Sequence, residues 1–365
     1  MINTENGKVV KTIEVGNQPI GVAFNLTNDM LYVANYGDDS VSIINVKTNS
    51  VEKVIKVGKG PSDIAVNMKT NTIYVTNLIS DTVSLINGET NSVMKTIEVG
   101  EEPSGIAVNS ETNMIYVVNT YAESVSVING KINSVVKIIN VGTNPVGVAV
   151  NPKTNMIYVT NMDGASVSVI DGKKNSVVRR ISNGIGVHPA GIVIDSKTDT
   201  VYVTNGIYDN TISVINGKTN SVIKVISLKT SAPWGMAFNK ETDIIYVVNM
   251  GSDSVRFINC KTNSIVKTMR IGDQPFYVTV NPKTKIAYVT NFNSGTLSVI
   301  DEKSLSIVKS ISVGYFPAAA VVNQNINTVY VANMVLSNPE IKVIDGRTNF
   351  ITRRIRTILS NRISV

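Results

Sequence analysis

The sequence predicts an all-β propeller, most simply one of eight four-stranded antiparallel blades. The main observation is a Tyr-Val-x-Asn motif that recurs eight times, at intervals of 42 or 44 residues. The copies begin at Tyr32, Tyr74, Tyr116, Tyr158, Tyr202, Tyr246, Tyr288 and Tyr330. Hydrophobic residues make up 43% of the chain and lie in short runs rich in Val and Ile, which is the composition of strands. A repeat of about 40 to 45 residues with four strands is typical of a propeller blade.

Each repeat contains four β-rich segments, and residues 142–183 show them most clearly. Strands are expected there at 146–150, 156–160, 166–170 and 176–181, separated by short turns rich in Asn, Asp, Gly and Pro. Connections this short join antiparallel neighbours, because a parallel crossover needs a dozen or more residues. One such sheet cannot bury both of its faces alone, so neighbouring copies must pack on it.

The strand count predicts how the ring closes. The three inner strand types occur eight times each, whereas the outermost type occurs nine times, because similar segments open and close the sequence. Either terminal segment could complete the last blade beside residues 341–344 and so remove an open edge. We favour the N-terminal segment 7–16, which leaves the residues after Phe350 surplus. A seven-bladed ring is the alternative. One domain is expected over residues 1–365.

The residues that recur in every copy indicate structural roles. The Tyr and Val of Tyr-Val-x-Asn lie on opposite faces of one strand, so both blade interfaces receive an apolar group. The Asn that follows stands where a strand enters a turn, and we expect its side chain to bond nearby backbone rather than to form a ring of ligands. Cys260 replaces a glycine of other copies, which favours a tolerated substitution over a reactive thiol.

The net charge of +7 is distributed unevenly over the repeat. Cations are expected on the outermost, edge strand of each blade, where charge blocks aggregation, and in the turns at one end of the ring. The loops of the other end are acidic, and they also carry most of the aromatic side chains that lie outside the Tyr-Val-x-Asn motif. This arrangement argues against nucleic-acid binding, because that function needs basic residues beside exposed aromatics.

The candidate binding residues lie in or beside these acidic loops. They are Tyr36, Tyr121, His188, Tyr208, Trp234, Phe276, Tyr277, Phe292, Tyr315 and Phe316. Aromatic rings with acids at the mouth of a channel suit a small cationic, sugar-like or peptide ligand, or a protein partner. The alternative is that these rings only plug the wide channel of a large ring.

His188 is the single candidate for a catalytic residue, as a general base with an acid such as Asp209 or Asp273. A lone histidine beside a proline in a loop is more often merely solvated. The sequence has no phosphate loop, zinc motif, calcium loop or nucleophile elbow, so we expect no metal site and no cofactor. No apolar run is long enough to span a bilayer.

The repeat "GxxPxGIAVN…TNxIYVTN…SVSVIDGxTNSVxxxIxVG" resembles the YVTN-type β-propeller repeat of archaeal surface-layer and YncE-like proteins, over almost the whole chain. The resemblance implies a non-catalytic scaffold or ligand-binding ring, usually at the cell envelope or surface, and we expect a monomer. The opening residues, "MINTENGKVV", lack the apolar core of a signal peptide, which leaves the compartment open.

Three other activities are implied by related propellers. The streptogramin (virginiamycin B) lyases and the propeller lactonases are enzymes of similar ring architecture, and only His188 could serve such chemistry here. YncE-like proteins are also associated with binding of single-stranded DNA, which the separation of aromatic and basic residues disfavours.

Overall fold

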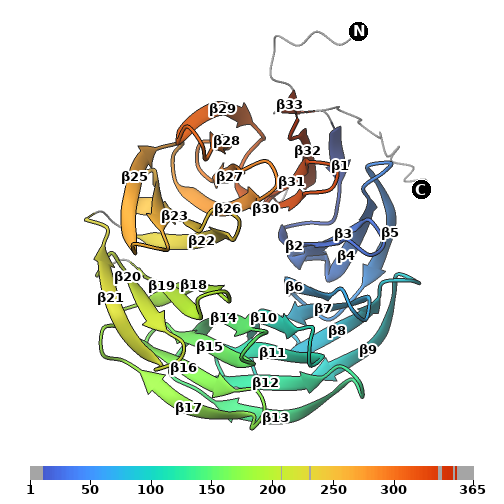
Figure 1. Ribbon diagram of the computed structural model, residues 1–365. Coiled ribbons are helices and arrows are strands. Elements are labelled where there is room, and N and C mark those ends of the chain that lie inside the picture. Colours follow the sequence, from blue (N-terminus) through green and yellow to red (C-terminus); the bar gives the residue numbers. More distant parts are fainter. Residues whose placement is uncertain (1–10, 207, 230–231, 336–338, 348–349, 352–365) are drawn as a thin grey trace, which may run out of the picture.

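The eight copies of the repeat form eight sheets arranged radially around a central channel, as the computed structural model shows (Figure 1). It describes residues 11–206, 208–229, 232–335, 339–347 and 350–351. The described residues contain no α-helix, only two short 3-10 turns, η1 (Tyr36–Asp38) and η2 (Met250–Ser252). The fold prediction of eight blades is confirmed, and the seven-bladed alternative is wrong.

Each blade has its strands in chain order from the channel outward. Blades 1 to 4 comprise β2 (Pro19–Asn25), β3 (Met30–Asn35), β4 (Ser40–Asn45) and β5 (Ser50–Lys56); β6 (Pro61–Asn67), β7 (Thr72–Asn77), β8 (Thr82–Asn87) and β9 (Ser92–Glu98); β10 (Pro103–Asn109), β11 (Met114–Asn119), β12 (Ser124–Asn129) and β13 (Ser134–Asn140); and β14 (Pro145–Asn151), β15 (Met156–Asn161), β16 (Ser166–Asp171) and β17 (Ser176–Ile181).

The second half of the ring repeats the same order. Blades 5 to 8 comprise β18 (Pro189–Asp195), β19 (Thr200–Asn205), β20 (Thr211–Asn216) and β21 (Ser221–Ser227); β22 (Pro233–Asn239), β23 (Ile244–Asn249), β24 (Ser254–Asn259) and β25 (Ser264–Arg270); β26 (Pro275–Asn281), β27 (Ile286–Asn291), β28 (Thr296–Asp301) and β29 (Ser306–Ser312); and β30 (Pro317–Asn323), β31 (Thr328–Asn333) and β32 (Glu340–Asp345). Blade 4 agrees with the four predicted strands to within about one residue at each end.

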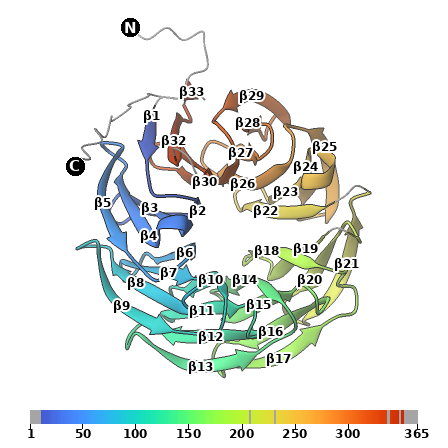
Figure 2. The same ribbon diagram turned by 180° about the vertical axis from the view of Figure 1, so that it is seen from behind.

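The N-terminal segment closes the ring, as predicted. Strand β1 (Lys11–Glu14) pairs antiparallel with β32 and is the outer strand of blade 8 (Figure 1). Residues 7–10 of the predicted segment lie outside the described part of the chain. The expectation that the C-terminal segment is surplus is wrong in one respect. Strand β33 (Phe350–Ile351) also pairs with β32, at the other end of the same edge, so the first and the last described strands both belong to blade 8 (Figure 2).

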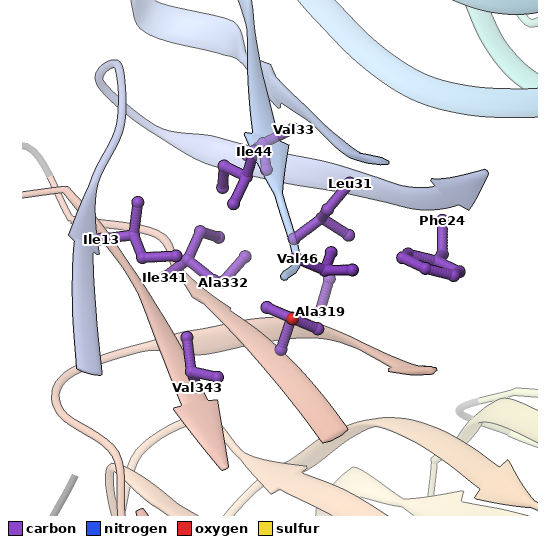
Figure 3. Packing of buried hydrophobic residues seen from close by; sticks show 11 residues of the cluster. Ile13, Phe24, Leu31, Val33, Ile44, Val46, Ala319, Ala332, Ile341 and Val343 are labelled. Atoms are coloured by element: carbon purple, nitrogen blue, oxygen red, sulfur yellow. The ribbon is translucent and has the colours of Figure 1, made fainter. Parts of the chain in front are cut away.

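The core consists of eight similar apolar layers, one between each pair of neighbouring blades. All eight tyrosines of the Tyr-Val-x-Asn motif are fully buried in these layers. At the seam between blades 8 and 1, Ile13 of β1 packs beside Ile341 and Ala332, opposite Leu31 and Ile44 of blade 1 (Figure 3). Every sheet is therefore covered on both faces by its neighbours, and its apolar side chains are shielded from solvent.

In most copies the Asn of the motif closes a turn inside its own blade, whereas Asn333 donates to backbone carbonyls of the loop that precedes blade 8. The amide of Asn119 donates to the hydroxyls of Ser124 (3.0 Å) and Ser126 (2.9 Å), and its side chain is fully buried. The same pattern holds for Asn35 and Asn77. The predicted structural role is therefore correct, although the partners are mostly hydroxyl groups of the following strand rather than backbone. This hydrogen bond explains why Ser or Thr recurs in the third strand of the blades.

Candidate functional site

The loops of the ring divide into two ends. The loops that follow the second and the fourth strand of each blade lie at the same end, because the strands of a meander alternate in direction. We call this end the aromatic end. It carries the predicted binding residues, whereas the lysine-rich turns lie at the opposite end. There Lys47 pairs with Asp29 (3.1 Å) and Lys261 with Asp243 (3.2 Å), so part of the basic charge is compensated locally.

Five of the predicted binding residues form one continuous chain of ring contacts at the aromatic end. Ring centroids lie 6.4 Å apart for Trp234 and Phe276, 5.6 Å for Phe276 and Phe292, 5.0 Å for Phe292 and Phe316, and 6.4 Å for Phe316 and Tyr315. These spacings are those of favourable aromatic pairs. The chain of rings, which we call the aromatic cluster, spans blades 6, 7 and 8.

Local backbone structure fixes the position of the cluster. Trp234 and Phe276 each follow the proline that opens an innermost strand, so both start next to the channel. Phe316 precedes such a proline and has a left-handed backbone (φ 51°), and its carbonyl accepts a hydrogen bond from the amide of Met334 (2.9 Å). Three rings of the cluster remain accessible, with 40% of Trp234, 43% of Phe316 and 77% of Tyr315 exposed. An apolar surface this accessible is free to contact a ligand.

His188 belongs to a second, smaller group. Its ring lies 5.4 Å from that of Tyr208, and its Nε2 is 3.8 Å from Oδ1 of Asp163 in the neighbouring blade. Neither of the predicted acid partners pairs with the His188 side chain in the described part of the chain. Asp209 instead accepts a hydrogen bond from the backbone amide of Val187 (2.6 Å), and no contact between His188 and Asp273 occurs among the described residues. Asp163 is a partner that sequence proximity did not reveal, because it lies on the neighbouring blade.

Tyr277 makes no ring contact with the aromatic cluster within the described residues, and an unpredicted carboxylate, Asp63, acts on its pKa. Asp63 occupies the equivalent position in blade 2. Burial raises the pKa of Tyr277, and the negative charge of Asp63 raises it further. Asp63 accepts hydrogen bonds from the amides of Ile64 (2.9 Å) and Ile106 (3.3 Å), yet burial raises its pKa to about 6. Comparing the copies in the sequence could have identified Asp63 as unusual, because the other blades have glycine, alanine or Tyr277 at this position.

The remaining predicted residues are not assembled with the others. Tyr36 lies in η1 of blade 1 and Tyr121 in blade 3, where it is 71% exposed. Neither makes a ring contact within the described residues. The structure therefore gathers five of the ten predicted residues into one cluster, places His188 and Tyr208 nearby in the ring order, and leaves Tyr36, Tyr121 and Tyr277 apart.

Several acids of the aromatic end have structural partners. Asp39, Asp81 and Asp253 each accept a hydrogen bond from a backbone amide in the loop that leads to the next blade, at 2.9 to 3.0 Å. These carboxylates hold neighbouring blades together, so only part of the predicted acidic surface is available to a ligand. The exposed acid of the aromatic end nearest in sequence to the cluster is Asp273, before Phe276.

The metal-ligating groups and the single thiol of the described residues give no further site. No group of three or more potential metal ligands occurs among the described residues. Burial raises the pKa of the Cys260 thiol to about 12, which disfavours the reactive thiolate. A cavity of about 750 Å³ lies at the rim between β1 and β5, and no residue of the aromatic cluster lines it. Within the described part of the chain, no helix has the length and apolarity to cross a bilayer.

Part of the sequence that forms these blades matches a known protein family. Residues 187–362, which begin just before blade 5, match the family of YNCE-like beta-propellers. This part of the chain is similar to the YncE-like β-propellers. The same repeat continues through blades 1 to 4, so the family resemblance of the sequence is confirmed, although nothing found here supports the archaeal surface-layer connection. No curated protein matches this propeller in sequence.

Solved structures with low sequence identity share the architecture. Hydrazine synthase from Kuenenia stuttgartiensis is 19% identical with a TM-score of 0.64, covering 80% of this propeller and 98% of that chain. The dihydro-heme d1 dehydrogenase NirN, in complex with DHE, is 12% identical (TM-score 0.74; 96% and 78% covered). The computationally designed protein Ika8 is 12% identical (TM-score 0.77; 93% and 100% covered). At these identities the likeness shows the fold alone.

Proposed function

We propose that this YncE-like propeller is a non-catalytic binding module whose contact surface is the aromatic cluster at the channel mouth. The observation that carries the proposal is the continuous chain of four contacts among five rings over three blades, with three of these rings exposed. A structural plug would bury such rings, whereas exposed aromatic surface beside a polar rim is typical of binding sites. The expected ligands are a carbohydrate, a peptide segment or a small cation of the cell envelope.

Trp234 provides the direct test, because it is the only tryptophan of the chain and belongs to the cluster. Its fluorescence should change when envelope polysaccharide or an envelope protein fraction is titrated in. Replacing Phe276 and Phe316 together with Ala should reduce the apparent affinity by about tenfold or more, if each lost ring contact contributes about 1 kcal/mol.

A matched control is Tyr121→Ala, which removes an exposed aromatic ring from the same end but outside the cluster. It should leave binding unchanged. If the double variant keeps its fold by circular dichroism and binds as the unmodified protein does, the cluster is not the contact surface.

A second candidate is a lactone-opening activity of the streptogramin-lyase type, favoured by the approach of His188 to Asp163. The histidine would act as general base and the carboxylate would orient it. The test is opening of a streptogramin lactone with magnesium added, compared between the unmodified protein, His188→Ala and Asp163→Asn. Activity lost in both variants would support an enzyme, and its absence from the unmodified protein would exclude this substrate.

Binding of single-stranded DNA is the remaining alternative. Lysines are concentrated in the turns opposite the aromatic cluster, so no described surface combines the two features that such binding uses. An affinity that falls steeply with salt concentration would be required for this function.

A further inference from the structure

The connection between blades 4 and 5 carries an insertion that is folded onto blade 5. Seven residues, 182–188, link β17 to β18, whereas four make the equivalent connection between β13 and β14. The amide of Ile185 donates to the carbonyl of Ser182 (3.0 Å), and the hydroxyl of Ser213 in blade 5 donates to the carbonyl of Gly184 (2.6 Å). Ile185 is buried in the apolar layer between the two blades. The insertion is therefore held in place at this seam.

Gly184 brings the insertion close to the outer strand of blade 5. Its backbone is left-handed (φ 79°), and a Cβ added to it would lie 2.9 Å from Cβ and Cγ1 of Val222. Glycine suits both this backbone conformation and this close contact. Ser182 and Asn183, which precede it in the chain, thereby lie beside β21.

A cavity of about 170 Å³ lies where the insertion meets the outer strands β17 and β21 of the two neighbouring blades (Figure 1). A water molecule occupies about 30 Å³ in the liquid, so the cavity admits a group several times larger. No acidic residue lines it, and two arginines do, which gives a formal charge of +2. Its polar lining residues are Arg179, Arg180, Ser182, Asn183, Asn220 and Ser221.

Several donors of this cavity have no partner in the protein. The guanidinium of Arg179 and the side-chain amide of Asn183 make no hydrogen bond or ion pair with any described residue. Asn220 accepts a hydrogen bond at Oδ1 from the hydroxyl of Tyr158 (3.1 Å), which leaves both N–H groups of its Nδ2 for another partner. Donors from both walls of the cavity are therefore available to an acceptor placed between them.

Both arginines depart from the repeat. Arg179 lies opposite Val169, and the other six complete blades have lysine at its position: Lys53, Lys95, Lys137, Lys224, Lys267 and Lys309. Arg180 replaces an uncharged residue of the other copies, and its Nη2 donates to the carbonyl of Val141 (2.7 Å). The insertion and the two arginines thus coincide at one seam of the ring.

We propose that this cavity binds a tetrahedral oxyanion group, phosphate or sulfate. The planar guanidinium of Arg179 can donate two parallel N–H bonds to two oxygens of the group, which the ammonium of a lysine cannot do. The amide nitrogens of Asn183 and Asn220 can donate to the remaining oxygens. A tetrahedral anion has acceptors on all sides, so it matches donors that come from two walls. No residue of the aromatic cluster lines this cavity, so the site is additional to the proposed contact surface.

The test is isothermal titration calorimetry with inorganic phosphate and with inorganic sulfate, at an ionic strength kept constant with sodium chloride. Each anion should bind at one site. Arg179→Gln should weaken binding by at least about tenfold, because a bond between charged groups is lost. Arg179→Lys should bind more tightly than Arg179→Gln but less tightly than the unmodified protein. Asn183→Ala should weaken binding severalfold.

A sulfated dextran oligosaccharide and its unsulfated form distinguish two sources of the group. If the sulfated form binds more tightly than inorganic sulfate, and Arg179→Gln removes this binding, the group is carried by a larger sugar. If the sulfated form binds no better than inorganic sulfate, the ligand is the free ion. Both results support an oxyanion site.

The control is Lys137→Gln, which removes one charge at the position equivalent to Arg179 on β13, away from the lining of the cavity. It should bind both anions as the unmodified protein does. Arg179 is exposed, so its variants should fold normally, and circular dichroism checks this. Four results would overturn the proposal: no binding of either anion, unchanged affinity in Arg179→Gln, an equal loss in Lys137→Gln, or acetate binding as tight as that of sulfate.

Discussion

Asp63 and Tyr277 show how a single residue can change the channel of a repeat protein. Five blades carry glycine at their position, among them Gly147, and in the eighth blade Ala319 stands there. The two exceptions place a carboxyl group and a phenol in the channel, where the charge of the first acts on the pKa of the second. Variation between copies therefore marks the interior as well as the loops.

The raised pKa of Asp63 predicts a pH-dependent effect of Asp63→Asn. Folding shifts the pKa of Asp63 from 3.8 to about 6, so ionisation of Asp63 destabilises the folded state. This loss of stability is absent below pH 3.8 and complete above about pH 6. Since Asn cannot ionise, the variant should be more stable than the unmodified protein at pH 8, by about 1 to 2 kcal/mol after allowance for partial solvent screening and one lost acceptor.

Urea unfolding at pH 8 and at pH 3.5 measures this difference, which should vanish at the lower pH. The exposed Asp273→Asn serves as the control and should change stability little at either pH. A variant that is less stable than the unmodified protein at pH 8 would show that the hydrogen bonds of Asp63 outweigh its desolvation.

At the scale of elements, neighbouring innermost strands approach each other closely at positions that carry glycine. A Cβ added to Gly147 would lie 2.4 Å from the carbonyl oxygen of Ala190 in the next blade and 2.7 Å from the hydroxyl of Thr160. Equivalent close approaches to a backbone oxygen occur at Gly21 (2.6 Å) and Gly191 (2.5 Å). The glycine thus sets the spacing of the strands around the channel.

Gly147→Ala should therefore destabilise the protein by about 1 to 3 kcal/mol, because backbone must move to relieve the overlap. The free energy of unfolding in urea gives the comparison. Gly206→Ala is a suitable control, since its nearest contact would be 3.3 Å and the expected loss is small. Equal stability of the two variants would mean that the blades can separate at little cost.

At the scale of the whole molecule, the ring is closed by the same contacts that join any two blades. Tyr330 of blade 8 donates its hydroxyl to Asn49 of blade 1 (2.9 Å), as Tyr202 does to Asn263 between blades 5 and 6 (2.7 Å). Tyr330 also packs in the seam with Ile13 and Leu31. Closure therefore uses no special device beyond the outer strand of blade 8.

Tyr330→Phe should cost about 1 kcal/mol, because it leaves Asn49 without its donor across the seam. Tyr74→Phe is the matched control: its buried hydroxyl has no hydrogen-bond partner among the described residues, so its removal should be neutral or stabilising. Thermal unfolding of both variants tests the difference. An equal loss for both would indicate that the hydroxyl bond contributes nothing to closure.

The candidate site was only partly predictable, because sequence places residues at an end of the ring but not beside one another. The period located Trp234, Phe276 and Phe316 in loops of one end, and the structure brought them into one chain of contacts. The same reasoning grouped Tyr121 with them, although it lies on a distant blade. It also paired His188 with Asp209, whereas the nearby acid, Asp163, comes from the preceding blade.

The repeat alone determined the blade, the number of blades and the buried tyrosine layers, because strand period, turn residues and repeat length are local properties that packing must satisfy. The tertiary structure decided which side chains meet across blades, the environment of Asp63 and the division of the last outer edge between β1 and β33. These depend on contacts between residues far apart in the chain, which form only when the ring is closed.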